Sequence, residues 1–531
     1  MRLTRRDLLR VAGGAALAGP LAACDSLPGN LGNIGDLAGS STGALLKSDL
    51  KLPDPFGVPL PVPAVLKPTR TDGTTDYYDI TQRRATVEII PGHRTEIWGY
   101  NGTFPGPTIA SRSGRRTVVR HRNELPVPVV VHLHGGRNPA EHDGYPIDYL
   151  LPTGGWSGGT GHSGHGGGQA GHVGRVSQGT KDYVYPLDQP AATLWYHDHR
   201  MDFTGPQVWR GLAGFHLLHD DIEDDLPLPK GDKDIPLMIC DRSFNEDGSL
   251  RYPAVDPSLA GEPGVTGTYM NGVLGDTILV NGAPWPYLEV SNTRYRFRVL
   301  NASNARRYKL RLDPAPGEGP SFVQVGSDLG LLGAPIGHQE IEIAQAERFD
   351  VVIDFSTYPI GTEVTLANGL DDGPTGRIMR FRVTRRETDA STVPAKLAEV
   401  EPIDGSSAAG TRSFLFSQGV ANRQQIWTIN GKPFDPDRAD ATARLGSTEI
   451  WKLTSDVHHP VHLHLAHFQV LRRQGRAPRA SDAGWKDTVD LRRGEVVEVA
   501  ARFTGHTGRY VFHCHNLEHE DMVMMGNLDV V

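Results

Sequence analysis

Short runs in which apolar and polar residues alternate recur along the chain, and stretches with the apolar spacing of a helix are scarce. Runs at 116–120, 127–132 and 495–503 have the composition and length of β-strands. Glycine and proline, with 62 and 39 copies, divide the chain into short segments. The pattern therefore predicts an all-β protein.

Chain length and net charge restrict the number of domains and the possible partners. The 531 residues are too many for a single hydrophobic core, so about three domains are expected. Hydrophobic residues make up 38% of the chain, which is enough to fill such cores. The formal net charge is −8 and no block of Lys and Arg lies beyond the N-terminus, so we expect no nucleic acid as a partner.

The N-terminus has the features of an export signal. Arg5 and Arg6 precede a weakly apolar run at 11–23, which is too short to span a membrane as a stable helix. We therefore expect residues 1–23 to be a signal peptide resembling the twin-arginine type. The alternative is an ordinary secretory signal with two chance arginines.

The residues that end this run resemble a bacterial lipobox, in which the cysteine, here Cys24, is acylated. Simple cleavage near Ala23 with a free cysteine is the alternative. Residues 24–74 are rich in Gly, Ser, Pro and Leu and are expected to form a tether. We thus expect an exported lipoprotein at the cell surface or in the periplasm, held to the membrane by its lipid alone.

The histidines are strongly clustered. The chain has 22, but only His338 lies between His219 and His458. Two histidines separated by one residue lie on the same face of a strand, so each such pair presents two imidazoles side by side. One pair could be a chance pair on a solvated strand, whereas four indicate a copper or zinc centre. The four pairs are His132 and His134, His197 and His199, His462 and His464, and His513 and His515.

Cys514 lies between the last two histidines, so its side chain should point to the opposite face of their strand. Blue-copper sites use two histidines, one thiolate and a weakly bound methionine. His459, Cys514, His519 and Met524 complete such a set. A structural zinc site would prefer more thiolates, and no second cysteine lies nearby in the sequence. The eight imidazoles of the pairs can serve three further coppers.

These motifs resemble those of the multicopper oxidase family, over about residues 75–531. The resemblance is strongest to the branch that holds bacterial spore-coat laccases, bilirubin oxidases and phenoxazinone synthase. It implies three cupredoxin-like Greek-key β-barrel domains, at about 75–225, 226–395 and 400–531, with a copper cluster where the first and last domains meet. A monomer is expected.

The resemblance also implies four copper ions per chain and a role for each ligand. The type 1 copper is assigned to His459, Cys514, His519 and Met524. The type 2 copper is assigned to His132 and His462. The type 3 pair is assigned to His134, His197, His199, His464, His513 and His515.

By the same resemblance, single electrons from a small reducing substrate enter at the type 1 copper through His519, and O2 is reduced to water at the other three. A laccase-type oxidation of phenols or similar donors is expected, and a Cu(I) or Mn(II) oxidase serving copper tolerance is the alternative. A copper nitrite reductase would lack the histidines on both sides of Cys514. A copper-storage protein would not need a thiolate linked to a cluster.

Two carboxylates match acidic positions that assist proton delivery in this branch, Asp143 and Glu520. Alternatively, Asp143 stabilises the turn with Gly144, and Glu520 only orients a ligand. Residues 154–174 contain eleven glycines and three histidines, and we expect a flexible surface insertion or, alternatively, a loop that gathers copper. Cys240 is expected to be a buried strand residue.

Overall fold

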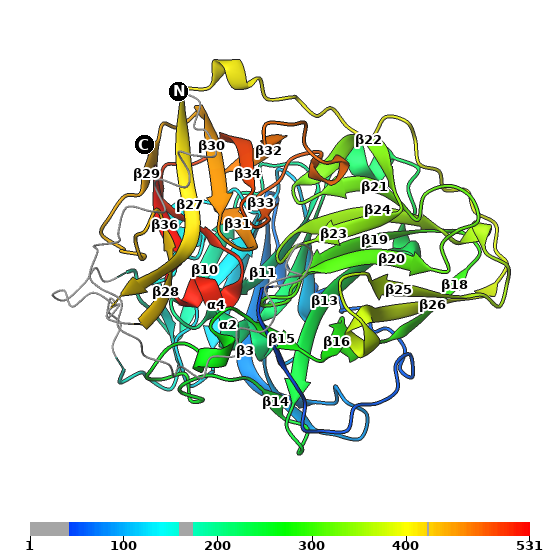
Figure 1. Ribbon diagram of the computed structural model, residues 1–531, viewed down its shortest axis with the longest axis horizontal. Coiled ribbons are helices and arrows are strands. Elements are labelled where there is room, and N and C mark those ends of the chain that lie inside the picture. Colours follow the sequence, from blue (N-terminus) through cyan, green and yellow to red (C-terminus); the bar gives the residue numbers. More distant parts are fainter. Residues whose placement is uncertain (1–41, 159–173, 422–423) are drawn as a thin grey trace, which may run out of the picture. The chain divides into compact units, whose positions relative to one another are not determined.

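The computed structural model describes residues 42–158, 174–421 and 424–531. Strands dominate it, which confirms the prediction of an all-β chain (Figure 1). The α-helices in the described part have six residues or fewer: α2 (Thr204–Trp209), α3 (Asp221–Asp225) and α4 (Leu517–Asp521). No helix among the described residues is long and apolar enough to cross a membrane.

The first sheet pair is built from residues 70–219. One sheet has the order β10 (Thr180–Tyr185), β6 (Arg116–Asn123), β3 (Thr75–Val87) and β2 (Arg70–Thr71), with β4 (Thr95–Tyr100) also paired to β3. The other has the order β5 (Gly106–Arg112), β12 (Ala213–His219), β11 (Ala192–Asp198) and β7 (Val131–His134). β11 and β7 are buried along their whole length, and each ends in a histidine motif.

The middle sheet pair is built from residues 234–385. Its first sheet has the order β17 (Ala283–Pro284), β16 (Thr277–Val280), β13 (Asp234–Phe244), β19 (Arg294–Asn301), β24 (Arg348–Asp354), β21 (Phe322–Ser327) and β22 (Gly330–His338), with β14 (Leu250–Arg251) paired to β13. Its second has the order β18 (Tyr287–Ser291), β26 (Arg377–Arg385), β25 (Glu363–Asn368), β20 (Tyr308–Asp313) and β23 (Glu340–Ile343). Phe297, Val351 and Phe381 lie in the core that both sheets enclose.

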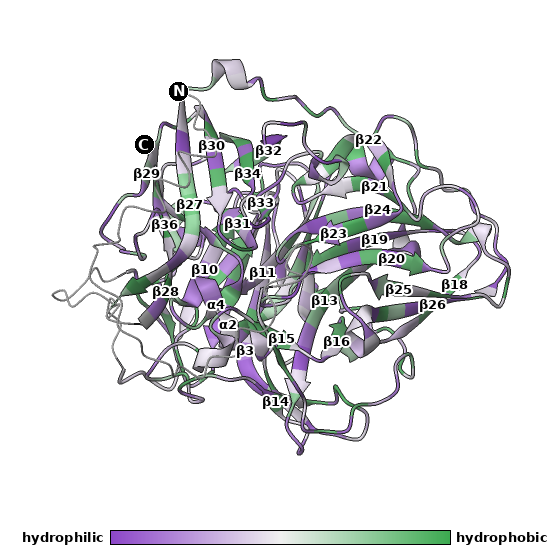
Figure 2. Cartoon of the chain, in the orientation of Figure 1, coloured by the Kyte–Doolittle hydropathy of each residue, from purple (hydrophilic) through white to green (hydrophobic). Residues whose placement is uncertain are grey.

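The last sheet pair is built from residues 410–530. One sheet has the order β28 (Gln424–Ile429), β27 (Gly410–Ala421), β30 (Thr448–Ser455), β34 (Val496–Arg502) and β32 (His467–Arg473). The other has the order β29 (Ala441–Ala443), β36 (Met525–Val530), β35 (Gly508–Cys514), β31 (His459–Leu463) and β33 (Thr488–Leu491). Figure 2 shows hydrophobic and hydrophilic residues mixed along the strands. Along β30 every second residue is buried, including Trp451 and Leu453. This is the alternation expected of a strand with one face in a core.

Between these sheet pairs lie residues 220–233 and 386–409, where the predicted domain limits at 226 and 400 fall. The limits themselves stay a prediction.

The segment before the first sheet pair differs from the predicted tether. Ala44–Leu46 forms β1, which pairs in parallel with β15 (Val273–Gly275). Phe56 and Leu60 donate backbone hydrogen bonds to Trp285 and Tyr287, and both side chains enter the middle core. At β1, Phe56 and Leu60 the expected tether is therefore packed against the fold, because these apolar side chains join buried clusters. The predicted signal peptide and Cys24 lie outside the described residues.

Candidate metal centre

Two pairs of adjacent strands, in two different sheets, carry the histidine pairs. His132 and His134 lie on β7 and His197 on β11, with His199 directly after it. β7 and β11 are antiparallel neighbours, and His132 pairs with His197 in their register. In the last sheet pair, β31 and β35 are antiparallel neighbours and pair His462 with His513. All eight imidazoles are buried, with exposures of 1% or less.

The first group consists of His132, from the first sheet pair, and His462, from the last. His132 Nδ1 donates to the carbonyl of Asp143 at 2.5 Å, and His462 Nδ1 donates to the carbonyl of Asp487 at 2.9 Å. Each ring therefore keeps its lone pair on Nε2, and the two Nε2 atoms are 3.4 Å apart. Two lone pairs that face each other at this distance have the arrangement of two ligands of one cation.

The second group consists of His199, His464 and His513. Nε2 of His513 lies 3.2 Å from Nε2 of His199 and 3.2 Å from Nε2 of His464. The opposite nitrogen of His464 is anchored, because Nδ1 donates to Asp143 Oδ2 at 2.7 Å. His513 Nδ1 lies 3.1 Å from Glu520 Oε2. Three lone pairs thus converge between the sheets.

The third group consists of His134, His197 and His515, whose ring centroids are 5.2 to 5.8 Å apart. His134 Nε2 donates to Asp487 Oδ1 at 3.1 Å, and His197 Nδ1 donates to the carbonyl of Asp198 at 2.8 Å. His134 Nδ1, His197 Nε2 and both nitrogens of His515 are buried and have no hydrogen-bond partner among the described residues.

The buried ring nitrogens without a hydrogen-bond partner indicate whether the histidines can bind metal ions. A buried polar atom without a partner costs about 1–3 kcal/mol, so several in one place call for a ligand. Burial lowers the pKa of His132, His134, His197, His462 and His464 well below the usual value, and nearby imidazoles and the Arg348 guanidinium add to this. The rings are therefore neutral at pH 7, which is the form that binds metal. The eight imidazoles fit three metal ions.

A separate group surrounds Cys514. Its Sγ lies 3.4 Å from His459 Nδ1 and 3.6 Å from His519 Nδ1, and these two nitrogens are 3.1 Å apart. Met524 is fully buried, and its carbonyl accepts a hydrogen bond from the backbone N–H of Cys514. Burial raises the pKa of the Cys514 thiol well above its usual value, so a metal ion must displace the proton to bind. Two imidazoles, a thiol and a methionine fit a blue-copper ion.

The second ring nitrogen, Nε2, of His459 and of His519 also has a polar partner. His459 Nε2 lies 2.9 Å from Asp456 Oδ1, and His519 Nε2 donates to the carbonyl of Asn271 at 3.2 Å. The ring of His519 is stacked on Trp427 with centroids 3.8 Å apart. His519 is itself fully buried, so the exposed residue Asn271 links it to the surface.

The two predicted carboxylates both contact the histidine cluster. Asp143 is 1% exposed, and burial raises its pKa well above the usual value. Gly144 follows it with a φ of +86°, and a Cβ there would lie 2.4 Å from the carbonyl of Val131. Only glycine therefore allows the turn that brings Asp143 beside His132.

Glu520 lies in α4, and its two oxygens face His199 at 3.6 Å and His513 at 3.1 Å. Burial alone would raise the pKa of Glu520, but the electrostatic contacts with His199 and His513 outweigh burial and hold the pKa below the usual range. Thr204 donates its hydroxyl to Glu520 Oε1 at 2.7 Å. Glu520 is thus an ionised group next to one set of metal-binding nitrogens.

Several residues of the site had no signal in the sequence. Asp487 contacts both His134 and His462, and Trp427, Asp456 and Asn271 contact the histidines beside Cys514. None of them lies in a motif. Cys240 is buried in β13, as expected. Most of the Gly-rich segment, residues 159–173, lies outside the described part of the chain.

Comparison with known proteins points to one family. Two sequence profiles described as multicopper oxidase match residues 409–531 and 81–155. A laccase of Bacillus subtilis is 38% identical over 531 residues, covering 89% of this chain and 97% of the relative. A bilirubin oxidase of Albifimbria verrucaria is 35% identical, covering 88% and 80%. The crystal structure of laccase from Pediococcus acidilactici Pa5930 matches with a TM-score of 0.76 and 31% identity, covering 92% of this chain and 96% of that one.

Proposed function

Because this chain belongs to the multicopper oxidase family, we propose that it is a laccase-type enzyme that oxidises small phenolic donors. As an oxidoreductase of this family it uses copper, O2 and a reducing substrate. The observation that carries the proposal is the arrangement of eight buried imidazoles in three groups, with the thiol of Cys514 beside one of these histidines on the same strand.

The family resemblance assigns a ligand role to each of these groups. The type 2 copper is held by His132 and His462. One type 3 copper is held by His199, His464 and His513, and the other by His134, His197 and His515. The type 1 copper is held by His459, Cys514, His519 and Met524. When bound, copper would supply one-electron chemistry, so that four donor electrons and four protons convert one O2 to two waters.

The chain's own residues join the two sites. On β35 the Cys514 side chain lies with His459 and His519, whereas its neighbour His513 lies with His199 and His464. One stretch of backbone therefore connects the thiol to the histidine cluster. Near the surface, the exposed Asn271 contacts the ring of His519, and this contact supports the proposal that the donor approaches there. Glu520 Oε2 can hold a proton beside His513 Nδ1, and Asp143 Oδ2 accepts the N–H of His464.

Copper analysis tests the proposed count. We expect the purified, copper-loaded chain to contain four copper ions, because the proposed ligands comprise three groups of imidazoles and one group around the thiol of Cys514. Dialysis against a strong copper chelator should remove the ions together with oxidase activity, and adding copper back should restore both. A content near two would favour a type 1 and type 2 arrangement such as that of a nitrite reductase and would contradict the proposal.

The choice of reducing substrate is tested by kinetics. The methionine at position 524 donates weakly to a type 1 copper and keeps its potential moderate, which suits easily oxidised donors. We expect kcat/KM for a dimethoxyphenol to exceed that for Cu(I) measured in the same buffer. A strong preference for Cu(I) that is lost when residues 154–174 are deleted would instead support the alternative of a metallo-oxidase.

We also propose that the protein is exported as a lipoprotein, on the basis of Arg5, Arg6 and Cys24. Replacing both arginines by lysine should leave the precursor in the cytoplasm, since a twin-arginine signal requires them. Cys24→Ala should be exported but released from the membrane fraction, as immunoblots of cell fractions would measure. A Cys24→Ala protein that stays fully membrane-bound would exclude the lipid anchor.

A further inference from the structure

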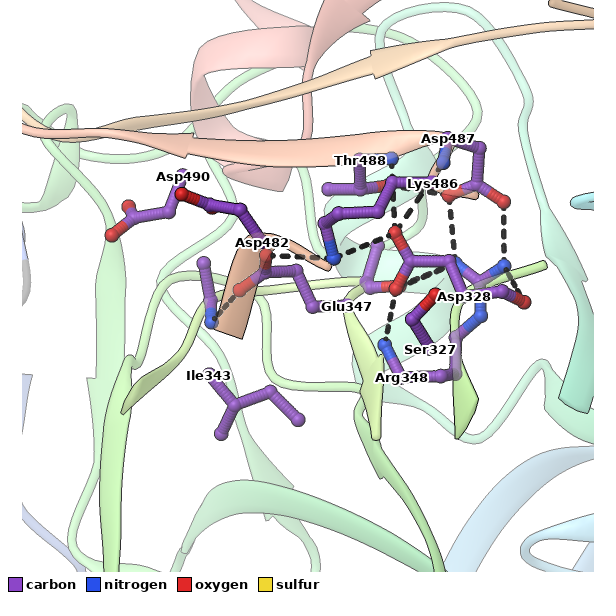
Figure 3. A network of polar contacts seen from close by, with 12 residues as sticks. Ser327, Asp328, Ile343, Glu347, Arg348, Asp482, Lys486, Asp487, Thr488 and Asp490 are labelled. Atoms are coloured by element: carbon purple, nitrogen blue, oxygen red, sulfur yellow. Dashed lines mark hydrogen bonds and ion pairs between the residues drawn. The ribbon is translucent and has the colours of Figure 1, made fainter. Parts of the chain in front are cut away.

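Among the described residues, the middle sheet pair contributes none of the proposed copper ligands, yet its residue Arg348 reaches the histidine cluster. Arg348 is the first residue of β24 and is fully buried. Its guanidinium binds both oxygens of Asp487, with Nη1 2.7 Å from Oδ1 and Nη2 2.5 Å from Oδ2. Figure 3 shows this pair within a larger network of buried polar residues. A two-point contact of this kind fixes the carboxylate in angle as well as in distance.

The orientation of Arg348 is itself fixed. A guanidinium has five N–H donors, and here the other three bind backbone carbonyls. Nε donates to Thr193 at 3.0 Å, Nη1 to Ala346 at 2.8 Å and Nη2 to Asp328 at 2.9 Å. Thr193 belongs to β11, the strand that carries His197. Arg348 therefore connects the first, middle and last sheet pairs at one point.

The backbone around Asp487 is held by the same network. Asp328 is fully buried, and its Oδ2 accepts the backbone N–H groups of Asp487 and Thr488 at 3.3 Å each. Its Oδ1 accepts the backbone N–H of Arg348 at 2.8 Å. The ammonium of Lys486, also fully buried, lies 3.0 Å from Asp328 Oδ2 (Figure 3). The middle sheet pair thus places both the side chain and the main chain of Asp487.

What Asp487 does follows from its contact with His134. Its Oδ1 accepts the N–H of His134 Nε2 at 3.1 Å, whereas Nδ1 of the same ring is buried without a partner among the described residues. A neutral imidazole carries one proton, so a proton held on Nε2 leaves the lone pair on Nδ1. A carboxylate that receives the outer N–H of a metal-binding histidine sets its tautomer and ring orientation.

Gly135 gives a second, independent indication that the pair is built into the site. This residue follows His134 with a φ of +87°. A Cβ at this position would lie 2.9 Å from Arg348 Nη2 and 3.0 Å from Asp487 Oδ2. The residue after His134 must therefore lack a side chain for the Arg348–Asp487 pair to approach the imidazole.

We propose that Arg348 is a positioning residue for the copper cluster, which holds the Asp487 carboxylate on His134 Nε2 and so presents Nδ1 of His134 as the copper-binding atom. The proposal rests on the proposed function, in which His134 binds a type 3 copper. It gives the middle sheet pair a direct part in the metal centre.

The test measures copper affinity in copper-loaded protein by competition with a chelator, and follows the visible band of the Cys514 site in the same samples. Arg348→Met and Asp487→Ala should weaken binding of the cluster copper by about 10- to 100-fold. The Cys514 band should remain, because neither residue contacts that group. The copper affinity of Arg348→Lys should lie between those of wild type and Arg348→Met, since lysine keeps the positive charge but cannot bind both oxygens of Asp487 as a guanidinium does.

Another buried arginine of the middle sheet pair provides a matched control. Arg307 of the middle sheet pair binds Asp490 of β33 at 2.6 Å, and both residues are buried. Arg307→Met should lower thermal stability but leave the affinity of the cluster copper unchanged. Equal copper loss in Arg307→Met and Arg348→Met, or wild-type affinity in Arg348→Met and Asp487→Ala, would overturn the proposal.

One further variant and the spectrum of the wild-type protein complete the test. If Arg348→Met does not fold, Asp487→Asn replaces it, because asparagine keeps an oxygen for His134 but not the charge for Arg348. Its copper affinity should lie between those of wild type and Asp487→Ala, and wild-type affinity in both Asp487 variants would overturn the proposal. Absence of a visible band in the copper-loaded wild-type protein would instead count against the proposed function.

Discussion

Replacing Cys514 by serine is expected to abolish both the intense visible absorption and the oxidase activity. The absorption arises when a thiolate transfers charge to Cu(II), and the hydroxyl of serine is too hard and too weakly acidic to replace it. Cys514 is the sulfur that faces His459 and His519, and the other cysteine among the described residues, Cys240, is buried in β13. Absorption spectra and oxygen consumption of the copper-loaded variant measure both effects.

Cys240→Ser is the matched control for this experiment. Cys240 is buried in a separate hydrophobic cluster with Met238 and Leu279, and none of the predicted ligands belongs to that cluster. Its serine variant should keep the visible band, although a buried hydroxyl costs some stability. A Cys514→Ser protein that keeps the band unchanged would disprove the assignment of the type 1 site.

Glu520→Gln is expected to slow the reaction with O2 while leaving oxidation of the donor at its normal rate. Glutamine keeps the size and polarity of the side chain but cannot carry a proton to the histidine cluster. Glu520 faces His199 and His513, not His459 or His519, so its loss should not affect electron entry. Loss of a positioned acid–base group typically costs about 10²- to 10⁴-fold in rate.

Stopped-flow absorption separates the two half-reactions. Anaerobic bleaching of the visible band by the donor reports electron entry, and its return after mixing with O2 reports reoxidation. Glu518→Gln is the control, because Glu518 lies in the same helix and is buried, but binds Asn304 and Tyr252. Asp143→Asn should behave like Glu520→Gln. Equal slowing of both half-reactions in Glu520→Gln would indicate a structural role instead.

Much of the fold and the candidate ligands could be predicted from the sequence because both depend on short-range patterns. Alternation with a period of two marks the strands, and the same period places His132 with His134 and His513 with His515 on one face. The position of Cys514 between two histidines likewise separates its side chain from theirs. The family resemblance, which the comparisons confirm, added the grouping of these residues into copper sites.

The sequence was less informative where a residue's environment depends on distant parts of the chain. Residues 24–74 were predicted to form a tether because they are rich in Gly, Ser, Pro and Leu. Three of their apolar side chains, Leu46, Phe56 and Leu60, are buried because strands more than 200 positions later provide a surface for them. Composition describes the segment itself and carries no information about such a surface.

The sequence by itself determined the strands, the eight paired imidazoles and the thiol between two of them. Only the tertiary structure decided which nitrogen of His132 and which of His134 is free. That choice depends on acceptors supplied from elsewhere: the carbonyl of Asp143 for His132, and Asp487, 353 positions away in the sequence, for His134. A strand pattern fixes which face a side chain occupies, whereas its hydrogen-bond partner is fixed by how separate sheets pack. Arg348 and Asp487 therefore became visible only when the three sheet pairs were seen together.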